Sequence, residues 1–183
     1  MAVGDVNSSE RGSGARYNDG KPDLALIPLT ILAESFNDTP AAEHAIHDAL
    51  HCLGMFQTTG DKGWLERALR AVNLDWRVCA RVFEYGKKKY AAWNWAKGMA
   101  WSIPIACAGR HALAILEGEV NDSESGLQHT GHFMANVVML RHFVDTFPEG
   151  NDLPPPEFFR RAPYSRIAAT DEILSASTSE EDA

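Results

Sequence analysis

The sequence has only three cysteines, and no two of them lie close together in the sequence. Cys52, Cys79 and Cys107 stand singly in apolar stretches, without a CxxC spacing. Isolated cysteines of this kind are typical of reduced core residues in a cytosolic protein. We therefore expect a cytoplasmic protein.

Signals for export or membrane insertion are also missing. The segment 1–16 is polar and rich in Gly and Ser, so it predicts no signal peptide. No stretch approaches the roughly 20 apolar residues that a membrane-spanning helix needs. The formal net charge of −8 argues against broad non-specific binding to DNA or to anionic membranes. Neither nucleic acid nor a membrane is thus expected as a partner.

Several catalytic motifs are absent as well. The sequence contains no GxxxxGK[ST] loop, which argues against a P-loop kinase or ATPase. It also lacks a GxSxG motif, and none of the three cysteines has an activating neighbour. Covalent catalysis through a serine or cysteine therefore has no support.

What the sequence does contain is helical periodicity around an apolar core. Hydrophobic residues make up 45% of the 183 residues, enough for one globular domain with tails. Strand-type alternation is nearly absent, so we predict an all-α bundle. Helices are expected at 28–36, 40–56, 64 to 85 or 90 with an interruption near Asn73, 102–117 with Ser102 as its cap, and 127–147. Gly86 to Gly98 is expected to be a loop.

Tails are predicted on both sides of this domain. Residues 1–15 have the composition of a flexible, solvated tail. Residues 149–183 begin with a Pro-rich segment and end in an acidic flexible tail. The single helical domain is therefore expected to span 16–148.

Polar side chains that can bind metals are concentrated in residues 110–136. They are His111, Glu117, Glu119, Asp122, Glu124, His129, His132 and Asn136. On a helix, His129, His132 and Asn136 fall within about 60° of one another, beside an apolar stripe. This mixture is compatible with a carboxylate-held Mg²⁺ or Mn²⁺ with histidines nearby, or with a direct His/carboxylate site. Alternatively, these residues bind no metal: the acidic residues simply flank a turn, and the histidines lie on the surface of a helix.

A second histidine stripe lies on the predicted helix 40–56. His44, His47, Asp48 and His51 share one arc, opposite the apolar face of this helix. The His47-Asp48 pair invites comparison with phosphohydrolases that use a His-Asp metal pair. The alternative is a solvated surface or a subunit contact.

A basic and aromatic cluster follows at residues 84–95. Lys87, Lys88 and Lys89 could neutralise a polyphosphate, and Tyr90, Trp93 and Trp95 could stack on a base. Alternatively, the lysines are simply exposed and the aromatic residues cover the end of the bundle.

Three segments together resemble a known family. They are ARYNDGKPDLALIP at 15–28, VFEYGKKKYAAWNWAKGMAWS at 82–102, and RHALAILEGEVNDSESGLQHTGHFMANVVML at 110–140. In these segments the chain is similar to the phage-encoded dATP/dGTP diphosphohydrolase (MazZ-like) family, which is related to the all-α MazG-type nucleotide pyrophosphohydrolases.

The resemblance implies a Mg²⁺-dependent enzyme that cleaves a deoxynucleoside triphosphate, dGTP or dATP, to the monophosphate and pyrophosphate. It also implies a MazG-like helical bundle, a homo-oligomer (dimer or tetramer), and a location in the host cytoplasm of a phage. The chain departs from the MazG pattern, because His129 and His132 stand where an ExxD motif is expected and no clear ExxE precedes them. Residues 35–80 look like a helical insertion.

The resulting hypothesis assigns a role to each candidate residue. Metal ligands, for Mg²⁺ or alternatively Mn²⁺, are expected to be Glu119, Asp122, Glu124, His129 and His132. Catalytic roles are assigned to His111, for proton transfer or for holding a ligand, and to Glu119. Nucleotide binding is assigned to Lys88, Lys89, Tyr90, Asn94, Trp95, Arg110 and Asn136. Two alternatives stay open: a His-Asp type triphosphohydrolase that releases tripolyphosphate, and a non-catalytic protein that binds nucleotide or a partner.

Overall fold

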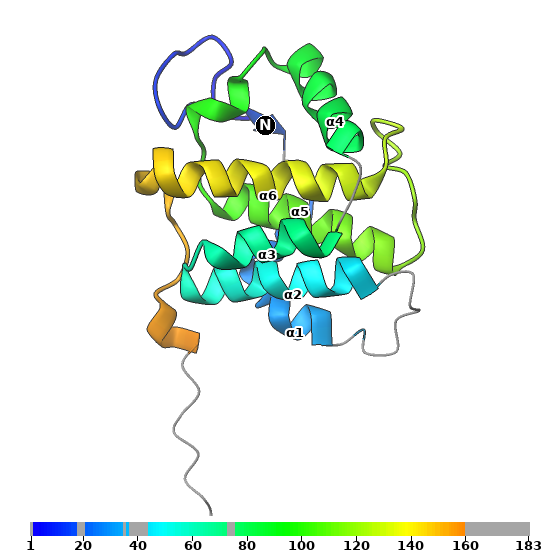
Figure 1. Ribbon diagram of the computed structural model, residues 1–183. Coiled ribbons are helices and arrows are strands. Elements are labelled where there is room, and N and C mark those ends of the chain that lie inside the picture. Colours follow the sequence, from blue (N-terminus) through cyan, green and yellow to red (C-terminus); the bar gives the residue numbers. More distant parts are fainter. Residues whose placement is uncertain (1, 18–20, 35, 37–43, 73–75, 160–183) are drawn as a thin grey trace, which may run out of the picture.

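A computed structural model describes residues 2–17, 21–34, 36, 44–72 and 76–159 of the chain (Figure 1). It is mostly helical, with α1 (Leu29–Glu34), α2 (His44–Thr59), α3 (Gly63–Val72), α4 (Trp76–Lys89), α5 (Ser102–Leu116) and α6 (His129–Thr146). Two short strands, β1 (Ala2–Val3) and β2 (Arg16–Tyr17), pair antiparallel. The prediction of an all-α fold is confirmed.

The core of the bundle is built around α6. Phe133, Val137, Leu140 and Phe143 of this helix are completely buried, and the helix packs against α3, α4 and α5. Figure 1 shows α6 and α5 running across the middle, with α3, α2 and α1 on one side and α4 on the other. At Gly131 a Cβ atom would lie 2.7 Å from the Val78 side chain of α4, so the missing side chain lets the two helices approach closely.

Several helix ends differ from the sequence-based prediction. α2 ends at Thr59 rather than near residue 56. α4 ends at Lys89, close to the longer of its two predicted ends, although Gly86 to Gly98 was also expected to be a loop. One glycine costs a helix only about 1 kcal/mol, and lysines in the last turn interact favourably with the helix dipole. Ser102 is the first residue of α5 rather than its cap. The Asp152 carboxylate accepts hydrogen bonds from both the backbone N–H, at 2.8 Å, and the hydroxyl of Ser102.

The N-terminal segment packs against the bundle, whereas its composition predicts a flexible tail. The Gly12 amide donates to the Lys97 carbonyl at 2.7 Å, and the Gly14 amide donates to the Gly98 carbonyl at 2.9 Å. A Cβ atom on Gly14 would lie 2.5 Å from the Gly98 carbonyl oxygen, so only glycine allows this approach. The contact brings Arg16 onto the body of the protein. The tail predicted at the other end lies outside the described residues from 160 onward.

The predicted insertion, residues 35–80, is part of the common core over its described portion. α2 packs on α3 and α5, and Leu50, Leu53 and Leu65 are completely buried. Whether relatives lack this segment stays a prediction. Residues 73–75, where an interruption is predicted, lie outside the described part of the chain. None of the described helices is long and apolar enough to cross a membrane.

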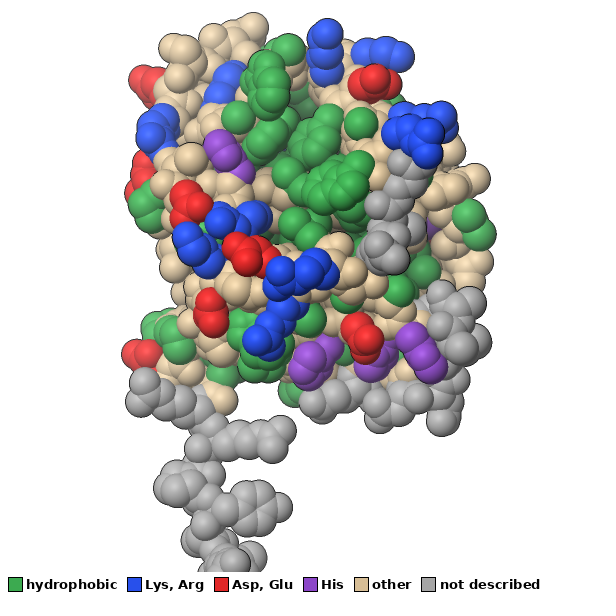
Figure 2. All heavy atoms as spheres, viewed as in Figure 1, with side chains coloured by type: hydrophobic (Ala, Val, Ile, Leu, Met, Phe, Trp, Pro, Cys, Tyr) green, Lys and Arg blue, Asp and Glu red, His purple; other side chains and the backbone are tan. Residues whose placement is uncertain are grey.

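The histidine stripe of α2 lies away from the other histidines. Figure 2 shows histidine side chains at the lower edge of the viewed face, in the region of α1 and α2. His47 forms a hydrogen bond at 2.9 Å through Nε2 with the carbonyl of Ala33, which ties α2 to α1. His44 is exposed and His51 is half-buried. This arrangement fits the structural alternative for the stripe better than a metal pair.

Candidate metal and nucleotide site

A cavity of about 790 Å³ opens between α4, the segment after it, and the connection from α5 to α6. Residues of the N-terminal segment complete its wall. The lining combines three kinds of side chain: imidazole and carboxylate groups, cationic groups, and aromatic rings. They include His111, Asp122, His129 and His132; Arg16, Lys21, Lys87, Lys89 and Arg110; and Phe83, Tyr85, Tyr90, Trp93 and Trp95. This volume is within the range of small-molecule binding sites.

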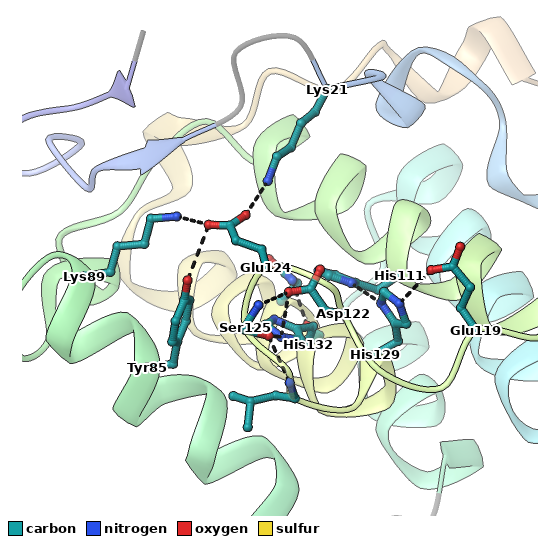
Figure 3. Close-up of polar contacts among 12 residues, drawn as sticks. Lys21, Tyr85, Lys89, His111, Glu119, Asp122, Glu124, Ser125, His129 and His132 are labelled. Atoms are coloured by element: carbon teal, nitrogen blue, oxygen red, sulfur yellow. Dashed lines mark hydrogen bonds and ion pairs between the residues drawn. The ribbon is translucent and has the colours of Figure 1, made fainter.

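Three histidines from two helices form a cluster on the cavity wall (Figure 3). His111 comes from α5, and its Nδ1 lies 2.8 Å from Nδ1 of His129 on α6. The ring of His111 also stacks on that of His132, with centroids 4.5 Å apart and planes 18° apart. His129 and His132 are one turn apart on α6, so both reach the same side of α5.

An exposed carboxylate orients His129 from behind. Nε2 of His129 lies 3.3 Å from Oε2 of Glu119, in the segment after α5. Because an ionised carboxylate only accepts hydrogen bonds, Nε2 of His129 carries the proton. The other ring nitrogen, Nδ1, points toward His111. Glu119 was predicted to be both a metal ligand and a catalytic residue, and the structure places it behind a histidine instead.

Asp122 is held in place by the turn that follows it. The backbone N–H of Ser125 donates to Oδ2 of Asp122 at 2.8 Å, and the Ser125 hydroxyl lies 2.8 Å from Nε2 of His132. Partial burial works to raise the pKa of Asp122, but the hydrogen bonds from Ser125 and the nearby His132 outweigh it and lower the pKa. Asp122 is therefore an ionised carboxylate facing the histidines.

The two perturbed histidines of the cluster are neutral near pH 7. Burial, reinforced by His132 and His129, lowers the pKa of His111 to about 3. Burial also lowers the pKa of His132 to about 4, although Asp122 works in the opposite direction. Neutral imidazoles keep a lone pair, which is the form that binds a metal ion or accepts a proton.

Glu124 belongs to a separate group of charges at the cavity. Its carboxylate accepts hydrogen bonds from Lys21 at 3.0 Å, from Lys89, and from the Tyr85 hydroxyl at 3.4 Å (Figure 3). The hydrogen bonds from Lys89 and Lys21 lower the pKa of Glu124 to about 2. Predicted as a metal ligand, Glu124 instead pairs with two cations.

The described residues thus contain one group suited to a metal ion. Ligand atoms of His111, Asp122 and His129 all lie within 4.8 Å of one another, and no other such group of three is found in the described part of the chain. The five predicted ligands, Glu119, Asp122, Glu124, His129 and His132, do not converge on this point. Sequence spacing could not show which of these residues come together, because the backbone of the connection between α5 and α6 directs Glu124 toward Lys21 and Lys89.

One comparison with known proteins finds a matching family. Residues 70–153 match the family model described as dATP/dGTP diphosphohydrolase, N-terminal. Over this segment, the chain is similar to the dATP/dGTP diphosphohydrolase family. The match confirms the resemblance drawn from the sequence. No curated protein and no solved structure matches the chain, so the likeness to a MazG-type bundle stays a prediction.

The matched segment contains the three clustered histidines of the cavity wall and the carboxylate that faces them, namely His111, His129, His132 and Asp122. It spans α4, α5 and α6 and the connection between the last two helices. The name of the family denotes a hydrolase of dATP or dGTP. The cavity, which is lined largely by this segment, is therefore the candidate active site.

Most of the predicted nucleotide-binding residues reach the cavity. Those that line it are Lys89, Tyr90, Asn94, Trp95 and Arg110. Asn94 is buried and exchanges hydrogen bonds with the backbone of Ala15, at 3.1 and 3.4 Å, so its side chain anchors the N-terminal segment.

Two predicted residues do not line the cavity. Lys88 is exposed and is not among the residues that line the cavity. Asn136 is buried behind the wall, where its side-chain amide donates to the carbonyl of His132 at 2.7 Å.

Two cationic residues of the wall, Arg16 and Lys21, were not predicted. Arg16 donates to the side-chain oxygen of Asn136 at 2.8 Å, and Lys21 pairs with Glu124. Both precede the matched family segment. The signal that could have found them is the stretch 15–28, which resembles the family and contains both residues.

Proposed function

We propose that the chain is a metal-dependent diphosphohydrolase that converts dGTP, or alternatively dATP, to the monophosphate and pyrophosphate. The observation that carries this proposal is the composition of one cavity. A His/His/Asp group, a set of cationic side chains and several aromatic rings line the same space of about 790 Å³. These are the three kinds of group that a metal, a triphosphate and a base require.

The cationic side chains of the cavity suit a triphosphate. Five of them, Arg16, Lys21, Lys87, Lys89 and Arg110, face three carboxylates in the lining, those of Glu84, Asp122 and Glu124. Lys21 and Lys89 now pair with Glu124. A triphosphate carries several negative charges and would compete with the Glu124 carboxylate for both lysines.

The aromatic rings suit the base. Phe83 and Trp95 lie with ring centroids 5.2 Å apart, and Trp93 and Trp95 with centroids 6.0 Å apart. Trp93 is 73% exposed and has a φ of 61°, a left-handed conformation that non-glycine residues adopt rarely. Its ring is therefore accessible at the edge of the cavity for stacking on a purine.

The reaction adds water across one phosphoanhydride bond, so that the bond between the α- and β-phosphate groups breaks and pyrophosphate leaves. A bound divalent ion supplies neutralisation of phosphate charge and activation of water. The chain's own residues supply the rest. The lysines and Arg110 hold phosphate oxygens, Glu119 orients His129, and Ser125 orients Asp122. His111, which is neutral, is available to hold the ion or to accept a proton.

Further parts of the proposal rest on the family resemblance. They are the use of Mg²⁺, or alternatively Mn²⁺, with the nucleotide, a homo-oligomer (dimer or tetramer), and a role in phage nucleotide metabolism in the host cytoplasm. The rival His-Asp type triphosphohydrolase differs in its product, because it releases tripolyphosphate.

The test is a panel of purified protein with each dNTP and NTP, with and without Mg²⁺ or Mn²⁺, and with products separated by chromatography. The proposal expects metal-dependent formation of dGMP or dAMP with pyrophosphate. Tripolyphosphate would support the rival enzyme, and an absence of turnover with every nucleotide would support a binding protein. Asp122→Asn is the matched inactive variant.

A further inference from the structure

The donor atoms of the His111/Asp122/His129 group are arranged as for one ion. The two Nδ1 atoms lie 2.8 Å apart, and two nitrogen ligands at right angles on one ion, each about 2.1 Å from it, are about 3 Å apart. One ligand atom from each of His111, Asp122 and His129 lies within 4.8 Å of the other two. For both Nδ1 atoms to bind one ion, His111 must carry its proton on Nε2, because in the metal-free contact its Nδ1 donates to Nδ1 of His129.

The second contact of each ligand supports the same conclusion. The Glu119 carboxylate accepts a hydrogen bond from Nε2 of His129, so Nδ1, the ring nitrogen that faces His111, is the one left to bind an ion. Metal-binding histidines in proteins are commonly held by such a carboxylate on their other nitrogen. Ser125 fixes Asp122 in a comparable way through its backbone N–H.

The chemistry of the ligands selects the kind of ion. Mg²⁺ prefers oxygen ligands and retains several waters, whereas imidazole nitrogens suit ions such as Zn²⁺, Fe²⁺ and Ni²⁺. Two imidazoles and one carboxylate are therefore a poor site for Mg²⁺. Three protein ligands also leave positions on the ion open to water or phosphate, as in catalytic rather than structural metal sites.

We infer that His111, Asp122 and His129 bind a resident transition-metal ion, which is distinct from the Mg²⁺ that accompanies the nucleotide. The function of this ion in hydrolysis rests on the function proposed above, whereas its binding does not. Glu119 acts as a positioning residue that holds His129 in the ligating orientation.

The test measures metal binding without nucleotide and without turnover. The full-length protein is stripped with a chelator and titrated with Co²⁺, whose visible absorption reports nitrogen ligation, and then with Zn²⁺ and Mg²⁺ by calorimetry. One Co²⁺ or Zn²⁺ per chain is expected to bind, and Zn²⁺ is expected to displace Co²⁺. Mg²⁺ at millimolar concentration is expected to leave the Co²⁺ spectrum unchanged.

Variants locate the ion. Glu119→Gln is expected to weaken Co²⁺ binding by about 10–100-fold, the usual effect of losing a carboxylate behind a ligating histidine. Asp122→Asn and His129→Gln are expected to weaken it more strongly. His51→Gln, on α2 and outside the cavity lining, is the matched control and should bind Co²⁺ like the wild type. Circular dichroism of each metal-free variant confirms that it is folded, and the isosteric Asp122→Asn keeps the test valid if His129→Gln unfolds.

The outcomes separate this inference from the proposed function. If no Co²⁺ or Zn²⁺ binds, or if binding survives in Asp122→Asn and His129→Gln alike, the inference is overturned, even if Mg²⁺-dependent hydrolysis is observed. If Co²⁺ binds at these residues but no nucleotide is hydrolysed, the inference stands and the proposed function fails.

Discussion

Nδ1 of His111 and Nδ1 of His129 lie 2.8 Å apart, although the two residues belong to different helices and are separated by 18 positions. Two imidazoles in this contact cannot both be protonated without strong repulsion. The contact therefore requires at least one neutral ring, and it makes the site sensitive to pH.

Stability of the metal-free protein is expected to fall as the pH is lowered from 7 to 5. In the folded protein the pKa of His111 is about 3 and that of His132 about 4, whereas an unfolded histidine has a pKa near 6.5. Between these values the unfolded state binds more protons, so this stability is complete above pH 6.5 and is lost toward pH 3–4. Urea unfolding should show a loss of about 2–4 kcal/mol between pH 7 and pH 5.

The carboxylates do not obscure this effect. The pKa of Glu124, about 2, is lowered by its pairing with lysines, so its contribution is present above pH 4.5 and is lost only at lower pH. In His111→Gln the dependence on pH should be clearly flatter. An equally steep dependence in the wild type and in His111→Gln would contradict the assignment of buried, neutral histidines.

Removing the charge of Glu124 is expected to tighten nucleotide binding. In Glu124→Gln, Lys21 and Lys89 lose the carboxylate with which they pair, and the triphosphate no longer competes with it. The Kd of a non-hydrolysable dGTP analogue, measured without metal, should fall severalfold. Glu84→Gln, which changes another carboxylate of the cavity lining, is the control. If Glu124→Gln instead abolishes binding of Co²⁺, then Glu124 is a metal ligand, as its sequence position first indicated.

Lys88 and Lys89, in the last turn of α4, are expected to differ in function, because only Lys89 lines the cavity. Lys89→Ala should raise KM for the nucleotide by roughly ten- to a hundredfold, because a hydrogen bond to a charged group contributes about 1.5–3 kcal/mol. Lys88→Ala should behave like the wild type, since Lys88 does not line the cavity. Steady-state kinetics at fixed ionic strength compares the two. Equal effects would show that the phosphates lie elsewhere on α4.

Trp93 is expected to contribute to binding of the base and not to stability. Its side chain is 73% exposed, so Trp93→Ala should leave the unfolding free energy nearly unchanged. Stacking of one base on an aromatic ring contributes about 1–3 kcal/mol, so the affinity for the dGTP analogue should fall roughly five- to a hundredfold. The affinity for inorganic tripolyphosphate, which has no base, should not change. A parallel loss for both ligands would argue against stacking.

Much of the fold was predictable because helical periodicity and helix-breaking residues are local properties. The helix predicted at 102–117 begins at the first residue of α5 and ends one residue later than α5, and the helix predicted at 127–147 exceeds α6 by two residues at its start and one at its end. Of the two predicted ends of the third helix, 85 and 90, the longer is close to the observed end of α4 at Lys89, so the first four residues of the predicted loop are helical. Contacts of α4 with α6 and the lysines of the last turn outweigh the low helix propensity of one glycine.

The segment that contains the candidate site was predictable, but the contacts between its side chains were not. His111, Asp122 and His129 lie in the stretch 110–136, and a density of ligand-type residues is visible in any sequence. Which atoms meet depends on side-chain packing: Glu124 turns to Lys21 and Lys89, and Glu119 turns to the back of His129. Arg16 and Lys21 reach the cavity through contacts of the N-terminal segment with residues far along the chain, which no local pattern encodes.

The central claim is that the His111/Asp122/His129 group and the surrounding cations and aromatic rings form a diphosphohydrolase active site. The most direct measurement is separation of the products from dGTP incubated with wild-type protein and with Asp122→Asn, each with and without divalent metal. The account predicts equal amounts of dGMP and pyrophosphate from the wild type with metal, and almost none from Asp122→Asn or without metal. Tripolyphosphate as the product, or full turnover by Asp122→Asn, would contradict it.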